Sequence, residues 1–209
     1  MKTENTDRYH LEELRIALDP RDPQHILPPR LDASQKVLDV GCGVGQTLIA
    51  AYPDRLTFGM DADFRALKAG SALTDRISFV CGQAESLPFA SGCFDVVMAR
   101  VSLPYTHINK SLREMRRVLR SGGLLWFTLQ RFSVVWRSTQ VWSGKRWIYF
   151  GYILINSILF HFLGCLIRFP ARGYESFQTE RGIRRALRAA GFREISIRNG
   201  LHFEVTARS

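Results

Sequence analysis

Cysteine is scarce in this sequence, and its spacing matches no common cysteine framework. The four cysteines are separated by 39, 12 and 72 residues, at positions Cys42, Cys81, Cys93 and Cys165. Zinc sites and redox motifs place cysteine pairs a few residues apart, and small secreted domains carry denser sets. We therefore expect reduced thiols and no structural metal.

An apolar leader is also lacking at the start. Residues 1–8 read Met-Lys-Thr-Glu-Asn-Thr-Asp-Arg, whereas a cleavable export signal needs an uninterrupted apolar stretch near its beginning. From this we expect a cytoplasmic protein, with peripheral contact to a membrane left open by the features of the second half.

Acidic residues are few in the second half of the chain. Residues 1–104 carry 11 basic and 14 acidic side chains, a net charge of −3, whereas residues 105–209 carry 18 and 5, a net charge of +13. Such asymmetry is typical of a face that meets nucleic-acid phosphates or membrane headgroups. Charge alone does not separate these two partners.

The remaining composition is that of a folded chain. The 209 residues are 46% hydrophobic and 23% charged, which excludes disordered and collagenous classes and suits a single domain. From residue 36 onward, short apolar runs alternate with helical segments, which favours a parallel sheet. The expected strands are Val37–Val40, Leu56–Met60, Ile77–Cys81, Phe94–Ala99, Leu124–Leu129, Glu194–Arg198 and His202–Ala207.

Helices are expected between these strands. A helix over 8–18 belongs to an N-terminal arm, Asn109 is a candidate N-cap for a helix that stops at Gly122-Gly123, and Thr179 caps the last helix. The Asn199-Gly200 turn joins the final two strands as a hairpin, so the last strand runs antiparallel. The sequence thus predicts an α/β fold with a doubly wound, mostly parallel, seven-stranded sheet.

A glycine cluster follows the first strand. In Asp39-Val40-Gly41-Cys42-Gly43-Val44-Gly45 the third glycine comes one residue early for the Gly-x-Gly-x-x-Gly pattern, which argues against a pyrophosphate ligand. Asp61 ends the second strand 20 residues after Gly41, where a carboxylate can accept both hydroxyls of an unphosphorylated ribose. These residues favour a nucleoside with a cationic tail, while a tight turn in an unrelated parallel sheet stays open.

Five ordered segments make the chain resemble the class I S-adenosylmethionine-dependent methyltransferases, in the small-molecule branch that includes quinone and sterol methyltransferases. The resemblance spans about residues 36–130 and rests on residues 37–45, 59–61, 82–89, 94–97 and 117–123.

That resemblance implies S-adenosyl-L-methionine as the cofactor and assigns its contacts. Asp39 and the glycine loop would hold the methionine moiety, Asp61 and Ala62 the ribose, and Gln83 with Ala84 the adenine; the loop residues are Gly41, Cys42, Gly43 and Gly45. Position 83 is commonly Asp in that branch, so the uncharged Gln83 would accept a hydrogen bond more weakly.

Acceptor-side candidates follow the fourth strand. Methyl transfer from a sulfonium is a direct displacement, so alignment in a dry pocket matters most. His107 could deprotonate an acceptor, Arg100 could orient an acidic one, and Tyr105 lies between them. The alternatives are a solvated or cap-region histidine and a surface ion pair. Ser102-Leu103-Pro104-Tyr105 partly resembles the Asn/Asp-Pro-Pro-Tyr motif of amino-group methyltransferases, but its first two positions differ.

An apolar insertion is expected after the fifth strand. Residues 147–167 carry no charge, and Asn156-Ser157 divides them into two short helices that could dip into one leaflet. Tryptophan, tyrosine and basic residues within 142–172 suit an anionic membrane surface, namely Trp142, Trp147, Tyr149, Tyr152, Lys145, Arg146, Arg168 and Arg172. A lid over the substrate pocket and a dimer surface remain alternatives, and each implies an apolar acceptor.

The expected organisation has four parts. Residues 1–35 form the N-terminal helical arm, 36–130 the cofactor-binding core, 131–175 the apolar insertion, and 176–209 the last helix and two strands of the same domain. The predicted function is methylation of a small lipophilic acceptor, such as a quinone, isoprenoid or lipid precursor, at a membrane surface. An RNA or protein methyltransferase and a non-catalytic, cofactor-binding membrane protein are the competing hypotheses; nucleic acid is the less favoured partner because no nucleic-acid module is appended.

Overall fold

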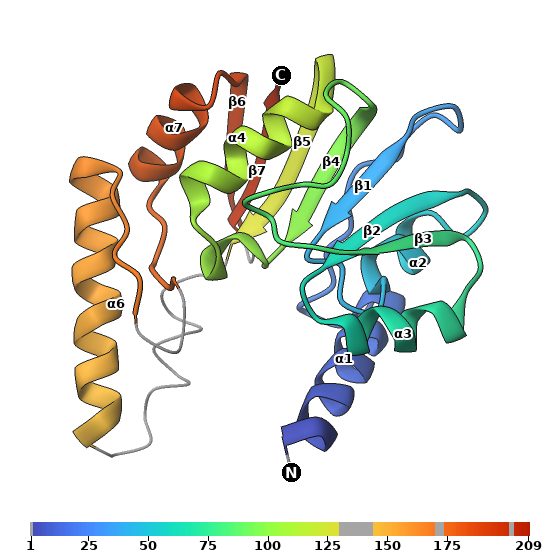
Figure 1. The fold of residues 1–209 in the computed structure, drawn as a ribbon, viewed down its shortest axis with the longest axis horizontal. Helices are drawn as coiled ribbons and strands as arrows, with labels where there is room; N and C mark the ends of the chain where they lie inside the picture. Colours follow the sequence, from blue (N-terminus) through green and yellow to red (C-terminus); the bar gives the residue numbers. More distant parts are fainter. Residues whose placement is uncertain (1, 130–143, 170–173, 201–202) are drawn as a thin grey trace.

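Seven strands form one sheet in the order β3-β2-β1-β4-β5-β7-β6 (Figure 1). The computed structural model describes residues 2–129, 144–169, 174–200 and 203–209, with side chains from residue 9 onward except those of 144–146. The strands are β1 Val37–Val40, β2 Thr57–Asp61, β3 Ile77–Cys81, β4 Phe94–Arg100, β5 Leu119–Leu129, β6 Arg193–Asn199 and β7 Phe203–Arg208.

Strand directions follow the prediction. The pairs β3–β2, β2–β1, β1–β4 and β4–β5 are parallel, and β7 lies antiparallel between β5 and β6. All four residues of β1 and the first six of β4 are buried, as expected for central strands covered on both faces. The doubly wound, seven-stranded α/β fold is therefore confirmed.

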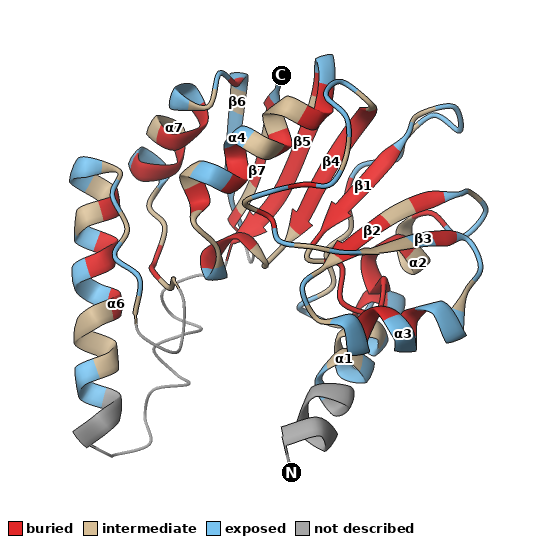
Figure 2. Cartoon of the chain, in the orientation of Figure 1, coloured by how far each residue is buried: buried red, intermediate tan, exposed pale blue. Residues whose placement is uncertain are grey.

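Helices cover both faces of this sheet. They are α1 Lys2–Leu18, α2 Gln46–Ala51, α3 Phe64–Leu73, the 3-10 turn η1 Leu103–Tyr105, α4 Ile108–Val118, α6 Gly144–Leu163 and α7 Glu180–Ala189. One apolar cluster joins α4 and α7 to the sheet, and a second joins α2 to the opposite face. In Figure 2 the sheet forms the buried centre, while α6 stands at the edge with buried and exposed positions side by side.

Helix α4 differs from the prediction at both ends. His107 rather than Asn109 is its N-cap, and the side chain of Asn109 instead donates a hydrogen bond from Nδ2 to the carbonyl oxygen of Gly164 at 2.6 Å. The helix ends at Val118, before the glycine pair, because Leu119 already pairs with Phe94 in β4. The prediction of Asn109 as the N-cap and the prediction of a stop at Gly122-Gly123 were therefore both wrong.

Helix α6 is one continuous helix rather than the two short helices predicted. Asn156 is fully buried, and its side chain bonds the chain that returns along the helix: Oδ1 accepts from the backbone N–H of Ile167 at 2.7 Å, and Nδ2 donates to the carbonyl oxygens of Ile167 and Glu175 at 3.0 Å each. A polar residue satisfied in this way does not interrupt a helix.

The rest of the insertion is described in part. Residues 131–143 and 170–173, with Trp142 and Arg172, lie outside the described residues, and so do the side chains of Lys145 and Arg146. Among the described helices, α6 included, none reaches the length and apolarity that a membrane crossing requires. The strand before the insertion, β5, and the next strand after it, β6, both pair with β7, so the chain leaves and re-enters one sheet.

Candidate active site

A cavity of about 1,080 Å³ opens at the carboxyl ends of β1, β2 and β4. Open α/β sheets place their ligands at this edge, and α1 projects from the same edge in Figure 1. The cavity is lined by the glycine loop, by the ends of β2 and β4, by η1, and by residues of α1 and of the turn that follows α1. The residues assigned to the cofactor and to the acceptor thus meet in one space.

The glycine loop depends on conformations that only glycine adopts without strain. Gly41 and Gly43 have φ angles of 80° and 56°, in the left-handed region. The backbone N–H groups of Gly41 and Cys42 both donate to the carbonyl oxygen of Met60, at 2.7 and 3.0 Å. A Cβ atom on Gly41 would lie 2.3 Å from the Cβ of Ser102, so the loop lies directly against the end of β4.

Two loop residues predicted to bind the cofactor face away from the cavity lining. Cys42 is buried beneath the loop against Gly59, and Gly45 is the N-cap of α2, next to Ile77 and Phe79. Gly41 and Gly43 line the cavity themselves. The loop would therefore present mainly its backbone to a ligand, with Cys42 and Gly45 shaping it from below.

Asp61 lines the cavity next to Ala62 with its carboxylate fixed on both oxygens. Oδ2 accepts from the backbone N–H of Gly43 at 2.8 Å, and Oδ1 accepts from that of Asp63 at 2.9 Å. Each carboxylate oxygen has a second lone pair. Asp61 can thus accept two further hydrogen bonds from vicinal hydroxyls without losing its own support.

Asp39 lies behind the loop, outside the cavity lining. Its side chain is buried, and Oδ1 has no hydrogen-bond partner among the described residues. Burial, and then the nearby charge of Asp61, raise the pKa of Asp39 to about 7, while Arg100 acts in the opposite direction. Asp39 therefore lies close enough to Asp61 and Arg100 for their charges to affect its pKa, but it does not line the cavity. A direct contact between Asp39 and the cofactor stays a prediction.

Gln83 and Ala84 line the cavity on the side of β3. Gln83 is exposed and Ala84 is buried, and the turn that holds them is closed by a hydrogen bond from the N–H of Ser86 to the carbonyl oxygen of Gln83 at 3.0 Å. Both residues thus lie at the cavity, and their contact with the adenine stays what the resemblance implies.

Helix α1 supplies a wall of the cavity that the sequence did not reveal. Tyr9, His10 and Glu13 line it. The Nδ1 atom of His10 and the Oε1 atom of Gln46 are both buried without a partner among the described residues, and both lie 2.9 Å from where a Cβ on Gly43 would stand. Partial burial, and then the charge of Glu13, raise the pKa of Tyr9 to about 12, so its hydroxyl stays protonated. Spacing predicted the helix, but no local pattern shows where a helix packs.

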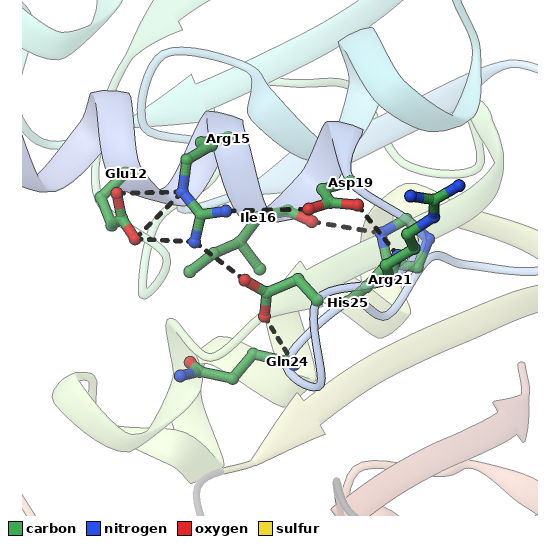
Figure 3. A network of polar contacts seen from close by, with 8 residues as sticks. Glu12, Arg15, Ile16, Asp19, Arg21, Gln24 and His25 are labelled. Atoms are coloured by element: carbon green, nitrogen blue, oxygen red, sulfur yellow. Dashed lines mark hydrogen bonds and ion pairs between the residues drawn. The ribbon is translucent and has the colours of Figure 1, made fainter.

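A polar network holds the end of α1 to the turn after it (Figure 3). Arg15 pairs with Glu12 at 2.9 Å and with Asp22 at 2.8 Å, and Nδ1 of the His25 ring lies 3.1 Å from the carbonyl oxygen of Ile16. Exposed pairs of this kind contribute little one by one, but a network contributes more. The turn lines the cavity through Pro23, Gln24 and Ile26, so the network shapes that wall.

Arg100, at the end of β4, forms a buried ion pair with α1. Its Nη1 lies 2.7 Å from Oε2 of Glu13, and the two side chains are 8% and 20% exposed. The surface ion pair considered as an alternative is therefore not what the structure shows. Arg100 lines the cavity and ties the helical arm to the sheet, and it could meet an anionic acceptor only by sharing its charge with Glu13.

The backbone turns sharply just after Arg100. Val101 has a φ angle of 58°, which is strained for a β-branched residue. Ser102 then donates from Oγ to the carbonyl oxygen of Val40 at 2.6 Å, which joins the end of β4 to that of β1. This strained turn directs η1 across the cavity, where Tyr105 is half-exposed at its rim.

His107 lies between the cavity and the chain that follows α6. Its backbone N–H donates to Oε1 of Glu85 at 2.7 Å, and its ring packs edge-on against Tyr174 with centroids 5.1 Å apart. The Nδ1 atom is buried without a partner among the described residues. His107 is thus the N-cap of α4, as the cap-region alternative expects, and it also lines the cavity.

The fold and the ordered site segments define the class of this protein. Residues 38–127 match the family described as "Methyltransferase domain". Residues 38–127 are therefore a methyltransferase domain, and the sheet around them has the fold of the class I S-adenosylmethionine-dependent methyltransferases, whose cofactor is S-adenosylmethionine. The loop, the Asp61 carboxylate and the unpartnered atoms of His10 and Gln46 fit an amino acid joined to a nucleoside.

Particular relatives agree with this class. The chain is 26% identical over 187 residues to a malonyl-[acyl-carrier protein] O-methyltransferase from Methylococcus capsulatus, covering 83% of this chain and 56% of the relative. It is 34% identical over 105 residues to a sterol 4-C-methyltransferase from Caenorhabditis elegans, covering 45% of this chain and 31% of the relative. The chain thus spans about half, or less, of the length of the curated relatives it matches.

A solved structure shows the same fold. A SAM-dependent methyltransferase from Methanosarcina mazei superposes with a TM-score of 0.57 at 20% identity, covering 86% of this chain and 94% of that one. The covered share of the chain is larger than residues 38–127, the segment matched by the family. The likeness therefore supports the fold of more than the matched segment.

Proposed function

We propose that this domain transfers a methyl group from S-adenosylmethionine to a small lipophilic acceptor at a membrane surface. The observation that carries the proposal is the single cavity that joins the glycine loop and Asp61 to Arg100, Tyr105 and His107. A direct displacement needs the acceptor and the methyl group in one enclosed space. The proposal leaves the methylated atom open.

The residues of this chain would divide the work between two ends of the cavity. The bound cofactor supplies a methyl group on a sulfonium ion. Asp61 and the loop backbone would hold the nucleoside and amino-acid parts, and α1 would exclude water from above them. At the acceptor end, Nδ1 of His107 would accept the proton that an acidic or hydroxyl acceptor loses as it takes the methyl group.

The lining at the acceptor end supports a lipophilic substrate. Val101, Leu129, Tyr105 and Tyr174 line it together with Arg100, so an apolar body with one polar or anionic end would be complemented. The two curated relatives are named for acyl-carrier-protein and sterol substrates. The sterol name supports an acceptor with an apolar part, and the malonyl name supports one with an anionic end. The apolar surface of α6 supports a reaction close to lipid.

The test follows the label from methyl-labelled S-adenosylmethionine into lipid, RNA and protein fractions of the source cell. The proposal expects label in the organic-soluble fraction and a large loss with His107→Ala, while equilibrium cofactor binding by that variant is retained. The exposed position Phe64 supplies the control Phe64→Glu, which should transfer normally. Label confined to RNA or protein would overturn the acceptor class. Absence of label in every fraction, with cofactor binding intact, would favour a non-catalytic binder.

A further inference from the structure

Helix α6 exposes an unusually apolar surface. We call it the α6 apolar face; its members are between 43% and 71% exposed and are Ile148, Leu154, Ile155, Ile158 and Phe162. They lie opposite the buried positions Ile153, Asn156 and Phe160, which hold the helix to the domain. Contiguous apolar surface of this kind marks a contact with a partner or a membrane.

Basic residues border this face at the C-terminal end of α6. Arg185 of α7 donates a hydrogen bond to the carbonyl oxygen of Phe162, so α7 lies directly beside the end of the helix. Arg181 and Arg188 are exposed and follow the same side of α7 at helical spacing with Arg185. The acidic residue of this helix, Glu180, pairs with Arg184 at 2.9 Å.

The opposite end of α6 carries an aromatic residue suited to an interface. Trp147 is 58% exposed, and tryptophan concentrates at the boundary between headgroups and acyl chains. No charged residue occurs between Trp147 and Ile167. The α6 apolar face is therefore bordered by a tryptophan at one end and by the arginines of α7 at the other.

We propose that the α6 apolar face docks on an anionic lipid bilayer. Apolar side chains would enter the boundary of the acyl chains while Arg181, Arg185 and Arg188 meet lipid phosphates, the combination that holds interfacial helices. A second copy of the chain fits less well, because the α6 apolar face carries no acidic residue that could pair with these arginines across a two-fold contact. Since β5 and β7 pair in one sheet, the helix would lie on the membrane with the rest of the domain on one side.

The docked face lies one layer from the acceptor end of the cavity. Ile153, on the buried side of α6, meets Pro104 and Tyr105 of η1 around a small internal space. Arg168 and Tyr174, in the chain after α6, line the main cavity themselves. Docking would bring a lipophilic acceptor from the bilayer toward Tyr105, and in this respect the proposal rests on the proposed function. Binding to lipid can be measured without methyl transfer.

The test is flotation of the purified protein with vesicles of phosphatidylcholine alone or mixed with phosphatidylglycerol. We expect binding to the mixed vesicles, at least tenfold weaker binding to phosphatidylcholine alone, and a steep loss with added salt. Ile155→Glu and, independently, Ile158→Glu should abolish binding, and Arg181→Gln with Arg188→Gln should weaken it severalfold. Phe64→Glu, an exposed aromatic on α3, is the matched control and should bind as the unmodified protein does.

Folding and cofactor binding are checked in every variant, by thermal unfolding and by the dissociation constant for S-adenosylhomocysteine. A protein that stays unbound with both vesicle types overturns the docking proposal. So does a concentration-dependent dimer that Ile155→Glu dissociates, which would assign the face to a second copy. Vesicle binding without methyl transfer would support docking and refute the proposed reaction. Transfer to a lipophilic acceptor without vesicle binding would support the reaction and refute both docking and the membrane location.

Discussion

The buried carboxyl of Asp39 ties the stability of the domain to pH. Its pKa is raised from 3.8 to about 7 by burial, and then by the charge of Asp61. The folded state therefore keeps a proton that the unfolded state releases, so stability is full at low pH and falls as pH rises toward 7.

Urea unfolding of the protein and of Asp39→Asn should show this difference. We expect the free energy of unfolding of the unmodified protein to fall relative to that of Asp39→Asn by up to about 1.4 kcal/mol per pH unit between roughly pH 4 and 7. A constant difference across that range would show that Asp39 is ionised in the folded state.

We expect the imidazole of His10 to form a hydrogen bond with the amino-acid end of the cofactor. Its Nδ1 is buried and unpartnered among the described residues, next to Gly43. His10→Ala should weaken binding of S-adenosylmethionine about tenfold, the loss expected for one hydrogen bond to a charged group. Calorimetric titration with 5′-methylthioadenosine, which lacks the amino-acid part, should show no such loss. Equal losses for both ligands would contradict the role, and Arg21→Gln serves as an exposed control.

At the residue scale, the predictions rest on local chemistry. The glycine loop and Asp61 could be singled out because a single strand–helix–strand unit sets their spacing. The structure places Gly41, Gly43 and Asp61 in the cavity lining, and their contact with the cofactor stays a prediction. His10 and Glu13 were missed because their place in the site depends on how α1 packs, a tertiary contact that helical spacing does not encode.

At the scale of elements, the pair between Glu13 and Arg100 holds α1 to β4. Removing one partner of a buried ion pair leaves the other charge uncompensated. Glu13→Gln should lower the free energy of unfolding by about 2 kcal/mol, and Arg100→Gln added to it should cost less than it does alone. A double-mutant cycle by urea unfolding measures this coupling; additive losses would show that the two side chains do not interact in solution.

Asn156 links α6 to the chain that returns beside it. In Asn156→Leu the N–H of Ile167 and the carbonyl oxygen of Glu175 lose their partner. We expect a loss of about 2–3 kcal/mol in the free energy of unfolding, whereas Ile155→Ala, on the exposed side, should change it little. A stable Asn156→Leu variant would indicate that α6 is held mainly by its apolar contacts.

The elements also show why patterns mislead at particular residues. The Asn-Ser pair within an apolar run favoured a helix break, yet the buried side chain of Asn156 is satisfied by chain 11 and 19 residues away in sequence. Likewise, the side chain of Asn109 is of the type that caps helices, but its amide nitrogen donates instead to the carbonyl oxygen of Gly164. Strands were predicted better, because burial on both faces leaves continuous apolar runs.

At the scale of the molecule, charge divides the chain into a slightly acidic first half and a strongly basic second half, and the cavity takes residues from both. The glycine loop and Asp61 belong to the first half, with its net charge of −3, and α4, α6 and α7 belong to the second, with +13. The sequence predicted this division and the seven-stranded sheet. It could not predict that α6 would be a single helix with one exposed apolar face, because that depends on what packs against it.

We expect this cavity to bind S-adenosylmethionine through the loop and the Asp61 carboxylate. Isothermal titration of the purified protein with S-adenosylmethionine, beside Asp61→Asn and the control Phe64→Glu, measures that binding. We expect saturable binding at one site, unchanged in the control and weakened about 10- to 100-fold in Asp61→Asn. A folded protein that takes up no cofactor, or one whose affinity is the same with asparagine at position 61, would contradict it.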